Sequence, residues 1–354
     1  MSASAGTLPA IVLGGTGYVA GELLRLLAGH PNLGPVTIVS DSRPGASVAQ
    51  AFPQLASAYR TATFVSFEEA LALAASLKQG AIFSAAPHGV SALLIARLLD
   101  AIAGSDVRIV DISADHRFAT PDAYAAVYGA PLASQTQLAQ FSCAVPEHLA
   151  TVTTAHIAHP GCFATAMLLA LVPLLDRDMI ESDVYISGVT GSTGSGRSPT
   201  AGTHHPDRHS DLYAYKPLSH RHAPEVEAAC RAVTGTAPRV HFVPHSGPFA
   251  RGIHVTLQAR LRGEHADADV NAVLADYYAR APFVDVLDHE PHLKHVVASN
   301  YSALRATSSD GHVVVLSVLD NLTKGAAGGA IQWMNRLQCL AEDTGLTACA
   351  AGWT

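Results

Sequence analysis

The residue best suited to nucleophilic chemistry is Cys162, which follows His159-Pro160-Gly161 and precedes an apolar run at 163–175. We expect that run to form a helix, so the cysteine stands at its N-terminus, where unpaired amide groups favour a thiolate. The other four cysteines, at positions 143, 230, 339 and 349, fit inert thiols. An odd number of cysteines and no C-x-x-C pair argue against a disulfide framework and against a cysteine-rich zinc site. Cys162 is therefore the candidate nucleophile.

A candidate acid or base lies in the segment KPLSHRHAPE at 216–225. Pro224 suits the start of a helix, and Glu225 then falls in the first turn, where the helix dipole favours a carboxylate. A histidine just before such a helix, His220 or His222, can be held by that carboxylate and exchange protons near neutral pH. The sequence therefore predicts a cysteine nucleophile and a histidine that serves as acid or base.

The other histidines of this region do not predict a metal site. His204, His205 and His209 lie close together, but Pro206 interrupts any helix that would align them. No acidic pair accompanies them in the pattern of an open zinc site. We therefore expect no metal.

A glycine-rich turn supplies the second chemical signal. Gly15-x-Gly17-x-x-Ala20 lies between a strand expected at 10–14 and a helix expected to begin at Glu22. Glycines at these positions let backbone amides approach a pyrophosphate at the helix N-terminus. We expect cofactor contacts from Gly14, Gly15, Thr16, Gly17, Tyr18 and Val19.

The choice between the two nicotinamide dinucleotides depends on the end of the next strand, expected at 36–39. Ser42 and Arg43 follow it and could hold a 2′-phosphate, whereas Asp41 could accept the free ribose hydroxyl of NAD. These residues favour NADP(H) modestly.

The elements that position these residues are those of an α/β protein. Short apolar runs at 10–14, 36–39, 81–84 and 107–112 alternate with helical stretches at 67–77 and 90–99. This alternation predicts a Rossmann-type, doubly wound parallel sheet with helices on both faces. Residues 86–89 and 113–117 then fall at the carboxyl ends of strands, where ligands bind in such sheets.

The pattern changes near residue 150 and predicts a second, α+β domain with a mainly antiparallel sheet. Its expected elements are a strand at 183–190, a long functional loop at 191–222, a helix at 224–233, antiparallel strands at 239–245 and 252–261, a helix at 267–280 and a strand at 312–319. A final helix, at about 325–342, is expected to pack on the first domain. We therefore predict a dinucleotide-binding domain at 1–158, completed by 325–354, and a catalytic and dimerisation domain at 159–324.

Length and composition narrow the function classes. The chain has 354 residues and a formal charge of −7, which argues against a general nucleic-acid binder. The N-terminus lacks a signal-peptide pattern, and the run at 163–175 is too short to span a bilayer. We expect a cytoplasmic protein with no membrane partner. Charged residues make up only 14% of the chain, which hints at buried subunit contacts in a homodimer or homotetramer.

Seven segments in order along the chain resemble the N-acetyl-γ-glutamyl-phosphate reductases. They are GGTGYVAGELLRLL at 14–27, APHGVS at 86–91, DISADHRF at 111–118, HPGCFAT at 159–165, YKPLSHRHAPEVE at 215–227, FVPHSGPFARGI at 242–253 and DNLTKGAAGGAIQWMN at 320–335. The aspartate-semialdehyde and glyceraldehyde-phosphate dehydrogenases share the glycine turn and the thiol, but HRHAPE and DNLTKGAAGG fit them poorly. A non-catalytic dinucleotide sensor would have no need of Cys162 and the histidine motif.

The resemblance implies a reaction and its residues. Cys162 matches the family's nucleophile, and the catalytic histidine lies in His220-Arg221-His222, where we favour His222. The implied reaction is the NADPH-dependent reduction of N-acetyl-γ-glutamyl phosphate, a small acyl-phosphate substrate, in arginine biosynthesis. Further cofactor contacts are expected from Pro87, Ser192, Gly194 and Asn321.

Substrate anions need cations, and guanidinium groups match both phosphate and carboxylate. The candidates are Arg117, Arg197, Arg221 and Arg251, with Glu225 beside them. The glycine-rich loop SGVTGSTGSGR at 187–197 is longer than the family's usual loop, and THHPDRH at 203–209 resembles a related branch that reduces carrier-linked glutamyl or aminoadipyl phosphates. A carrier-linked substrate is therefore the alternative.

Overall fold

The computed structural model describes residues 7–131 and 133–352, which form two compact units. The first unit comprises Met1–Cys143, Val152–His159 and Ala330–Leu346, and the second comprises Ala144–Thr151, Pro160–Gly329 and Thr347–Thr354. The division thus differs from a single cut after residue 158, because the short stretch at 144–151 belongs to the second unit. Positions 1–6, 132 and 353–354, which include the ends of the expected domain ranges, lie outside the described residues.

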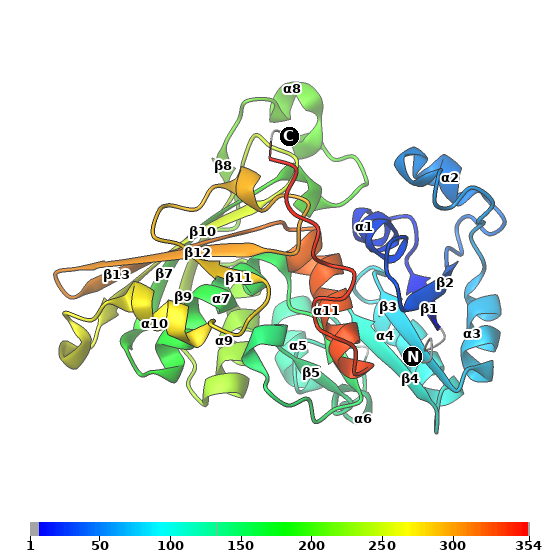
Figure 1. The fold of residues 1–354 in the computed structure, drawn as a ribbon, viewed down its shortest axis with the longest axis horizontal. Coiled ribbons are helices and arrows are strands. Elements are labelled where there is room, and N and C mark those ends of the chain that lie inside the picture. The colour runs from blue at the N-terminus through cyan, green and yellow to red at the C-terminus, as the bar shows by residue number, and fades with distance from the viewer. Residues whose placement is uncertain (1–6, 132, 353–354) are drawn as a thin grey trace, which may run out of the picture. The chain divides into compact units, whose positions relative to one another are not determined.

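The first unit is built on a six-stranded sheet in which every neighbouring pair is parallel (Figure 1). Its strands are β1 (Leu8–Leu13), β2 (Leu33–Ile38), β3 (Gln79–Ser84), β4 (Asp106–Asp111), β5 (Phe141–Cys143) and β6 (His156–Ala158). Their order is β2-β1-β3-β4-β6-β5, so the chain leaves β1 toward one side and returns on the other at β3. This strand order confirms the predicted Rossmann-type sheet. In such sheets ligands bind at the point where the strand order reverses, here between β1 and β3.

The helices of the first unit follow the strands as the sequence pattern indicates. They are α1 (Tyr18–Leu27), α2 (Val48–Ala51), α3 (Phe67–Ser76), α4 (Ser91–Ala101), α5 (Pro121–Tyr128) and α6 (Gln135–Leu138). A capping box of Ser66 and Glu69 starts α3. Helix α1 begins four residues before the expected Glu22, because Gly17 is extended (φ −79°, ψ 169°) and lets the chain turn helical immediately after it.

The second unit contains a mixed seven-stranded sheet. Its strands are β7 (Ile180–Thr190), β8 (Tyr213–Ala214), β9 (Arg239–Ser246), β10 (Ile253–Leu261), β11 (Val284–Val286), β12 (Ser302–Ser309) and β13 (His312–Leu319), in the order β11-β12-β13-β10-β7-β9-β8. Strand β10 is antiparallel to β7 and β13, but β9 is parallel to β7. The runs expected to be antiparallel, now β9 and β10, do run in opposite directions, but β7 lies between them. Strand β9 pairs antiparallel with β8 and parallel with β7, because a helix connects β7 to β9 and such crossovers join parallel strands.

One face of this sheet packs on helices. They are α7 (Cys162–Asp176), α9 (His222–Thr234) and α10 (Val270–Tyr277), and the four-residue α8 (His205–Arg208) lies in the long loop. Strand β10 buries alternate residues, including Ile253, Val255 and Leu257, against this core. Every residue of α7 from 163 to 175 is buried, so the helix that begins at Cys162 lies inside the core of the unit.

The last helix is shorter than expected and has an unusual start. A π-helical turn covers Thr323–Ala327, and α11 continues over Gly328–Leu337. The stretch Ala330–Leu346 belongs to the first unit, where Gln338 Nε2 donates to the carbonyl of Gly80 at 2.8 Å. Among the described helices, none is long and apolar enough to cross a membrane.

Candidate active site

Cys162 is the first residue of α7, as the sequence predicts. Gly161 precedes it as an N-cap without a side-chain cap, so the positive end of a fifteen-residue helix faces the thiol. The Gly161 amide donates to Glu225 Oε1 at 2.6 Å, which ties the first turn of α9 to the start of α7. A Cβ at Gly325 would lie 2.8 Å from the Cβ of Cys162, so the π-turn packs directly against the cysteine.

A cavity of about 380 Å³ lies beside Cys162 within the second unit. It brings together five of the residues that the sequence singles out, namely Cys162, Gly194, His220, Arg221 and His222. The other lining residues are Phe163, Thr190, Ser195, Tyr213, Tyr215, Lys216 and Ser246. The lining contains two permanent cations and no carboxylate. The cavity therefore suits an anionic molecule that must approach a thiol.

The two histidines of the motif occupy different local positions. His222 is the first residue of α9, which begins two residues before the expected Pro224. His220 lies just before the helix, and its Nδ1 accepts the His222 amide at 3.3 Å. Burial, with Arg221 and Lys216 nearby, lowers the pKa of His220 to about 4, so its imidazole is neutral at pH 7. Both rings lie edge-on to Phe163, the residue after the cysteine.

The sequence reasoning missed several cavity residues, of which Tyr215 and Lys216 carry the most chemistry. Tyr215 stacks edge-on to His220 at a centroid distance of 5.6 Å. Burial, with the Cys162 thiol nearby, raises the pKa of Tyr215, so its hydroxyl remains a proton-bearing donor. Both residues belong to the YKPLSHRH segment. Their position four or five residues before His220 is the feature of the sequence that could have identified them.

The glycine-rich loop after β7 is bound to a neighbouring stretch of the same unit. Backbone amides of Ser192 and Thr193 donate to the carbonyls of Phe249 and Ala250 at 2.9 and 3.0 Å. Asn321 closes the arrangement, because its Nδ2 donates to Thr193 Oγ1 at 3.1 Å and its Oδ1 accepts an amide at 2.7 Å. Gly194 of this loop lines the cavity, whereas Ser192 and Asn321 are not among the lining residues.

Arg251 is engaged by a carboxylate that the sequence reasoning did not identify. Its Nε and Nη2 each donate to the fully buried Asp320 at 3.0 Å, and Nη2 also donates to Thr323 Oγ1 at 3.0 Å. Asp320 Oδ1 in turn accepts the amides of Leu322 and Thr323 at the start of the π-turn. The predicted substrate residue Arg251 thus also anchors the turn that packs on the nucleophile.

A buried ion pair also ties down the same π-turn. Lys324 Nζ lies 2.5 Å from Glu147 Oε1, and the two side chains are 0% and 1% exposed. Removal of one partner of such a pair leaves an uncompensated charge in the core and destabilises the fold. The apolar surroundings gave no sequence signal for either residue.

In the first unit, the glycine turn has the form that dinucleotide binding requires. Gly14 adopts φ +70°, and a Cβ there would lie 2.6 Å from the backbone of Ala85. A Cβ at Gly15 would lie 2.7 Å from Ile38, whereas one at Gly17 would meet nothing closer than 3.9 Å. The chain therefore packs tightly behind the turn and stays open in front of the uncapped start of α1. These residues fit a pyrophosphate.

The residues expected at the ribose end lie on the surface of the same unit. Ser42 Oγ is 3.2 Å from Ser40 Oγ, and Asp41 Oδ1 accepts the Phe67 amide at 2.8 Å at the start of α3. Arg43 is exposed, and within the described chain no carboxylate forms an ion pair with it. Pro87 is exposed after β3, at the carboxyl edge of the sheet.

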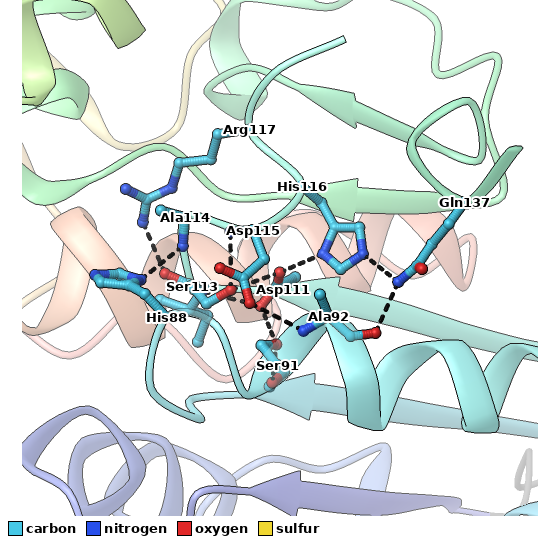
Figure 2. A network of polar contacts seen from close by, with 12 residues as sticks. His88, Ser91, Ala92, Asp111, Ser113, Ala114, Asp115, His116, Arg117 and Gln137 are labelled. Atoms are coloured by element: carbon cyan, nitrogen blue, oxygen red, sulfur yellow. Dashed lines mark hydrogen bonds and ion pairs between the residues drawn. The ribbon is translucent and has the colours of Figure 1, made fainter. Parts of the chain in front are cut away.

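A closed polar network follows β4 (Figure 2). His116 Nδ1 lies 2.6 Å from Asp111 Oδ2, and His116 Nε2 lies 2.7 Å from Gln137 Nε2. Because the Gln137 amide nitrogen is a donor, His116 Nε2 accepts and Nδ1 donates to the carboxylate. Burial alone would raise the pKa of Asp111, but hydrogen bonds from His116 and Ser113 hold it below its ordinary range.

The network fixes the segment that carries Arg117 (Figure 2). Asp115 accepts the amides of Gly89 and Ala92 at 2.9 Å, joining this segment to the start of α4. Arg117 is 7% exposed and donates from Nε to the His159 carbonyl at 3.0 Å and from Nη2 to the Ile112 carbonyl at 2.7 Å. Its guanidinium is therefore bound to the backbone of His159, a residue three positions before Cys162 in the chain.

Two protein-family models match parts of the chain. Residues 9–141 match the NAD-binding domain of semialdehyde dehydrogenases, and residues 162–321 match their dimerisation domain. The first match contains the glycine turn, and the second begins at Cys162.

Curated proteins similar to the chain extend over nearly all of it. N-acetyl-γ-glutamyl-phosphate reductase of Acidithiobacillus ferrooxidans is 38% identical, over 96% of this chain and 98% of the relative. The enzyme of that name from Pseudomonas aeruginosa is 37% identical over 96% and 98%, and that from Staphylococcus saprophyticus is 35% identical over 95% and 96%.

Solved structures agree in fold. Aspartate semialdehyde dehydrogenase II of Vibrio cholerae superposes with a TM-score of 0.67 at 14% identity, over 94% of this chain and 98% of that one. The NADP complex of the Candida albicans aspartate semialdehyde dehydrogenase gives a TM-score of 0.64 at 16% identity, over 96% and 99%. At these identities the likeness concerns the fold.

Proposed function

The chain belongs to the family of N-acetyl-γ-glutamyl-phosphate reductases, and we propose that it forms a thioester at Cys162 during the NADPH-dependent reduction of N-acetyl-γ-glutamyl phosphate. The products are N-acetylglutamate 5-semialdehyde and phosphate. The observation that carries this proposal is the cavity that Cys162 shares with two histidines, two cations and no carboxylate. An acyl phosphate needs such a thiol, because direct attack by water would only hydrolyse it.

The proposed mechanism assigns the first step to Cys162. Its thiolate attacks the acyl carbon and expels phosphate, which divides a difficult reduction into two easier steps. The start of α7 favours the anionic sulfur, and the Cys162 amide is a candidate donor to the developing oxyanion. Bound nicotinamide cofactor supplies the hydride.

The second part of the mechanism needs a proton at the substrate oxygen or the sulfur. The thiohemiacetal that follows reduction collapses to aldehyde and thiol, and a histidine can move the proton involved, which is typically worth about 10²–10⁴-fold in rate. We assign this role to His222, with His220 as the neighbouring alternative. Arg117, Arg221 and Arg251 are the proposed partners of the substrate anions, and Glu225 positions the start of α7.

The proposed cofactor is NADP(H). Gly14, Gly15 and Gly17 shape the turn, the backbone of Thr16, Tyr18 and Val19 faces the pyrophosphate, and Ser42 and Arg43 meet the 2′-phosphate. Pro87, Ser192, Gly194 and Asn321 remain the further predicted cofactor contacts. The exposed, unpaired Arg43 supports NADP over NAD, because a free guanidinium is suited to a phosphate.

The free N-acetylated substrate is favoured over a carrier-linked one, since the curated relatives described above carry the name of the N-acetyl enzyme. The match to a dimerisation domain supports self-association, and we propose a cytoplasmic homodimer or homotetramer. The domain assignment proposed is a cofactor domain made by the first unit and a catalytic domain made by the second.

A steady-state assay in the phosphorolytic direction tests the proposal. N-acetylglutamate semialdehyde, NADP and phosphate should together yield NADPH, and omission of phosphate should stop turnover. Rapid acid quench of enzyme with acyl phosphate, in the absence of cofactor, should trap an acyl group on the peptide that contains Cys162. Turnover only with a carrier-bound substrate would show that the alternative is correct.

A further inference from the structure

The segment before His220 holds its backbone in an unfavourable conformation. Lys216 adopts φ +45° and Leu218 adopts φ +56°, both in the left-handed region, which is unfavourable for a residue that carries a Cβ. Hydrogen bonds on either side fix this geometry, because Tyr215 donates its amide to Pro244 at 3.0 Å and Leu218 donates to Phe242 at 2.9 Å. Strain held in this way is typical of functional sites.

The side chain of Lys216 lines the Cys162 cavity. Within the described residues no carboxylate lies within ion-pair distance of its ammonium group, and the cavity lining itself contains none. His220 lines the same cavity, and burial, then Arg221 and then Lys216 lower its pKa. Lys216 thus brings an uncompensated positive charge close to the nucleophile.

The reaction proposed above needs two cations at this place. An N-acylated glutamyl phosphate carries two anionic groups, the α-carboxylate and the phosphate. Arg251 already uses two of its nitrogen atoms on Asp320, and the cations that line the cavity of the second unit are Lys216 and Arg221. The number of cavity cations therefore equals the number of substrate anions.

We propose that Lys216 is a substrate-binding residue that holds one of these two anions by a charge-assisted hydrogen bond. The inference rests on the proposed function and adds a residue to it. The lysine side chain is flexible, but the strained turn fixes its backbone at the wall of the cavity. The ammonium group therefore starts from a defined position when it reaches for an anion. Arg221, whose planar fork suits two-point contacts, is the other cation of the cavity, and Arg117 and Arg251 remain proposed partners of the same two anions.

The test replaces Lys216 by Met and measures the Michaelis constants in the phosphorolytic direction. A raised constant for phosphate, by about tenfold or more, assigns Lys216 to the phosphate, and a similar rise for the semialdehyde assigns it to the α-carboxylate. Lys216→Arg should restore most of the affinity because it keeps the charge. Lys294→Met, which removes another exposed lysine of the same unit, should change neither constant.

Constants for both substrates that stay within twofold of the wild-type values in Lys216→Met would overturn the inference. A lowered kcat with unchanged constants would do the same, because it would place Lys216 in the chemical step or the fold. Protection of Cys162 from alkylation by phosphate or by the semialdehyde gives a second readout, which should weaken in the Met variant. Failure of the proposed function is distinct, since the wild-type enzyme would then show no turnover.

Discussion

Two polar clusters that each contain a buried histidine differ in how their polar atoms are used. In the first unit, Asp111, His116 and Gln137 bond to one another and to nearby backbone, and their side chains are buried. In the second unit, His220 and Arg221 line a cavity with Cys162. A histidine whose two nitrogen atoms are both satisfied within the protein fixes a segment, whereas one at a cavity can reach a substrate.

The comparison teaches that burial of a histidine does not by itself mark it as catalytic. His116 and His222 are 2% and 7% exposed, so exposure hardly separates them. What separates them is the surface that surrounds the ring, which is protein on all sides for His116 and partly cavity for His222. Substitutions in the two clusters should therefore have opposite signatures, with stability lost in one and rate lost in the other.

The largest effect is expected for Cys162→Ala. Removal of the sulfur removes the thioester step, so reductase turnover should fall below detection while NADPH affinity stays nearly unchanged. Steady-state rates and a fluorescence titration with NADPH measure the two properties. Cys349→Ala, which removes an exposed thiol of the same unit, is the matched control and should keep wild-type rates. Undiminished turnover in Cys162→Ala would remove the nucleophile assignment.

The next effect separates the two cavity histidines. His222→Asn should lower kcat by about 10²–10⁴-fold, the range for general acid or base catalysis. His220→Asn should lower it by less than about tenfold, because the low pKa of His220 leaves it uncharged at pH 7 and unable to donate as an imidazolium. The comparison needs only kcat for both variants at pH 7. The reverse order would transfer the acid and base role to His220.

The contrast with the first unit is tested by His116→Phe. The variant removes one buried hydrogen-bond partner from Asp111 and one from Gln137, which should lower the free energy of unfolding by about 2–4 kcal/mol. Urea unfolding measures this loss. At a temperature well below the transition, kcat should fall less than tenfold. If His116→Phe instead kept its stability and lost rate as His222→Asn does, the two clusters would not differ in the way described.

The smallest effect is expected for Arg43→Leu. The loss of an exposed guanidinium should raise the Michaelis constant for NADPH by about tenfold and leave that for NADH unchanged, since only NADPH carries the 2′-phosphate. Arg60→Leu removes another exposed arginine of the first unit and serves as control. Equal changes for both cofactors would exclude a role for Arg43 in recognising that phosphate.

Sequence reasoning succeeded where one short stretch contains both the reactive or binding residue and the helix or strand that positions it. The glycines at 14–17 need only the strand before them and the helix after them, and Cys162 needs only the helix that it starts. It failed for β12, because SALRATSS has no strong alternation and its strand pairing comes from β13. The direction of β9 was predictable in principle, since a helix at 224–233 separates it from β7.

The missed residues of the site depend on contacts distant in sequence. Lys324 meets Glu147 across 177 positions, and Arg251 meets Asp320 across 69. No local pattern announces such a pair. The Asp111–His116 pair is local, but its closure needs Gln137, whose short helix carries no distinctive motif. The fold and the nucleophile were therefore predictable from local patterns, whereas the surroundings of the nucleophile were not.

The glycine at position 325 gives the site a sensitivity that no substrate contact would reveal. A single methyl group added there would meet Cys162 at 2.8 Å, and the buried helix behind the cysteine leaves it little room to retreat. We therefore expect substitution of Gly325 by alanine to displace the Cys162 sulfur and to leave the binding residues in place. We expect such an enzyme still to bind its substrate and its cofactor, but to form the thioester at Cys162 poorly.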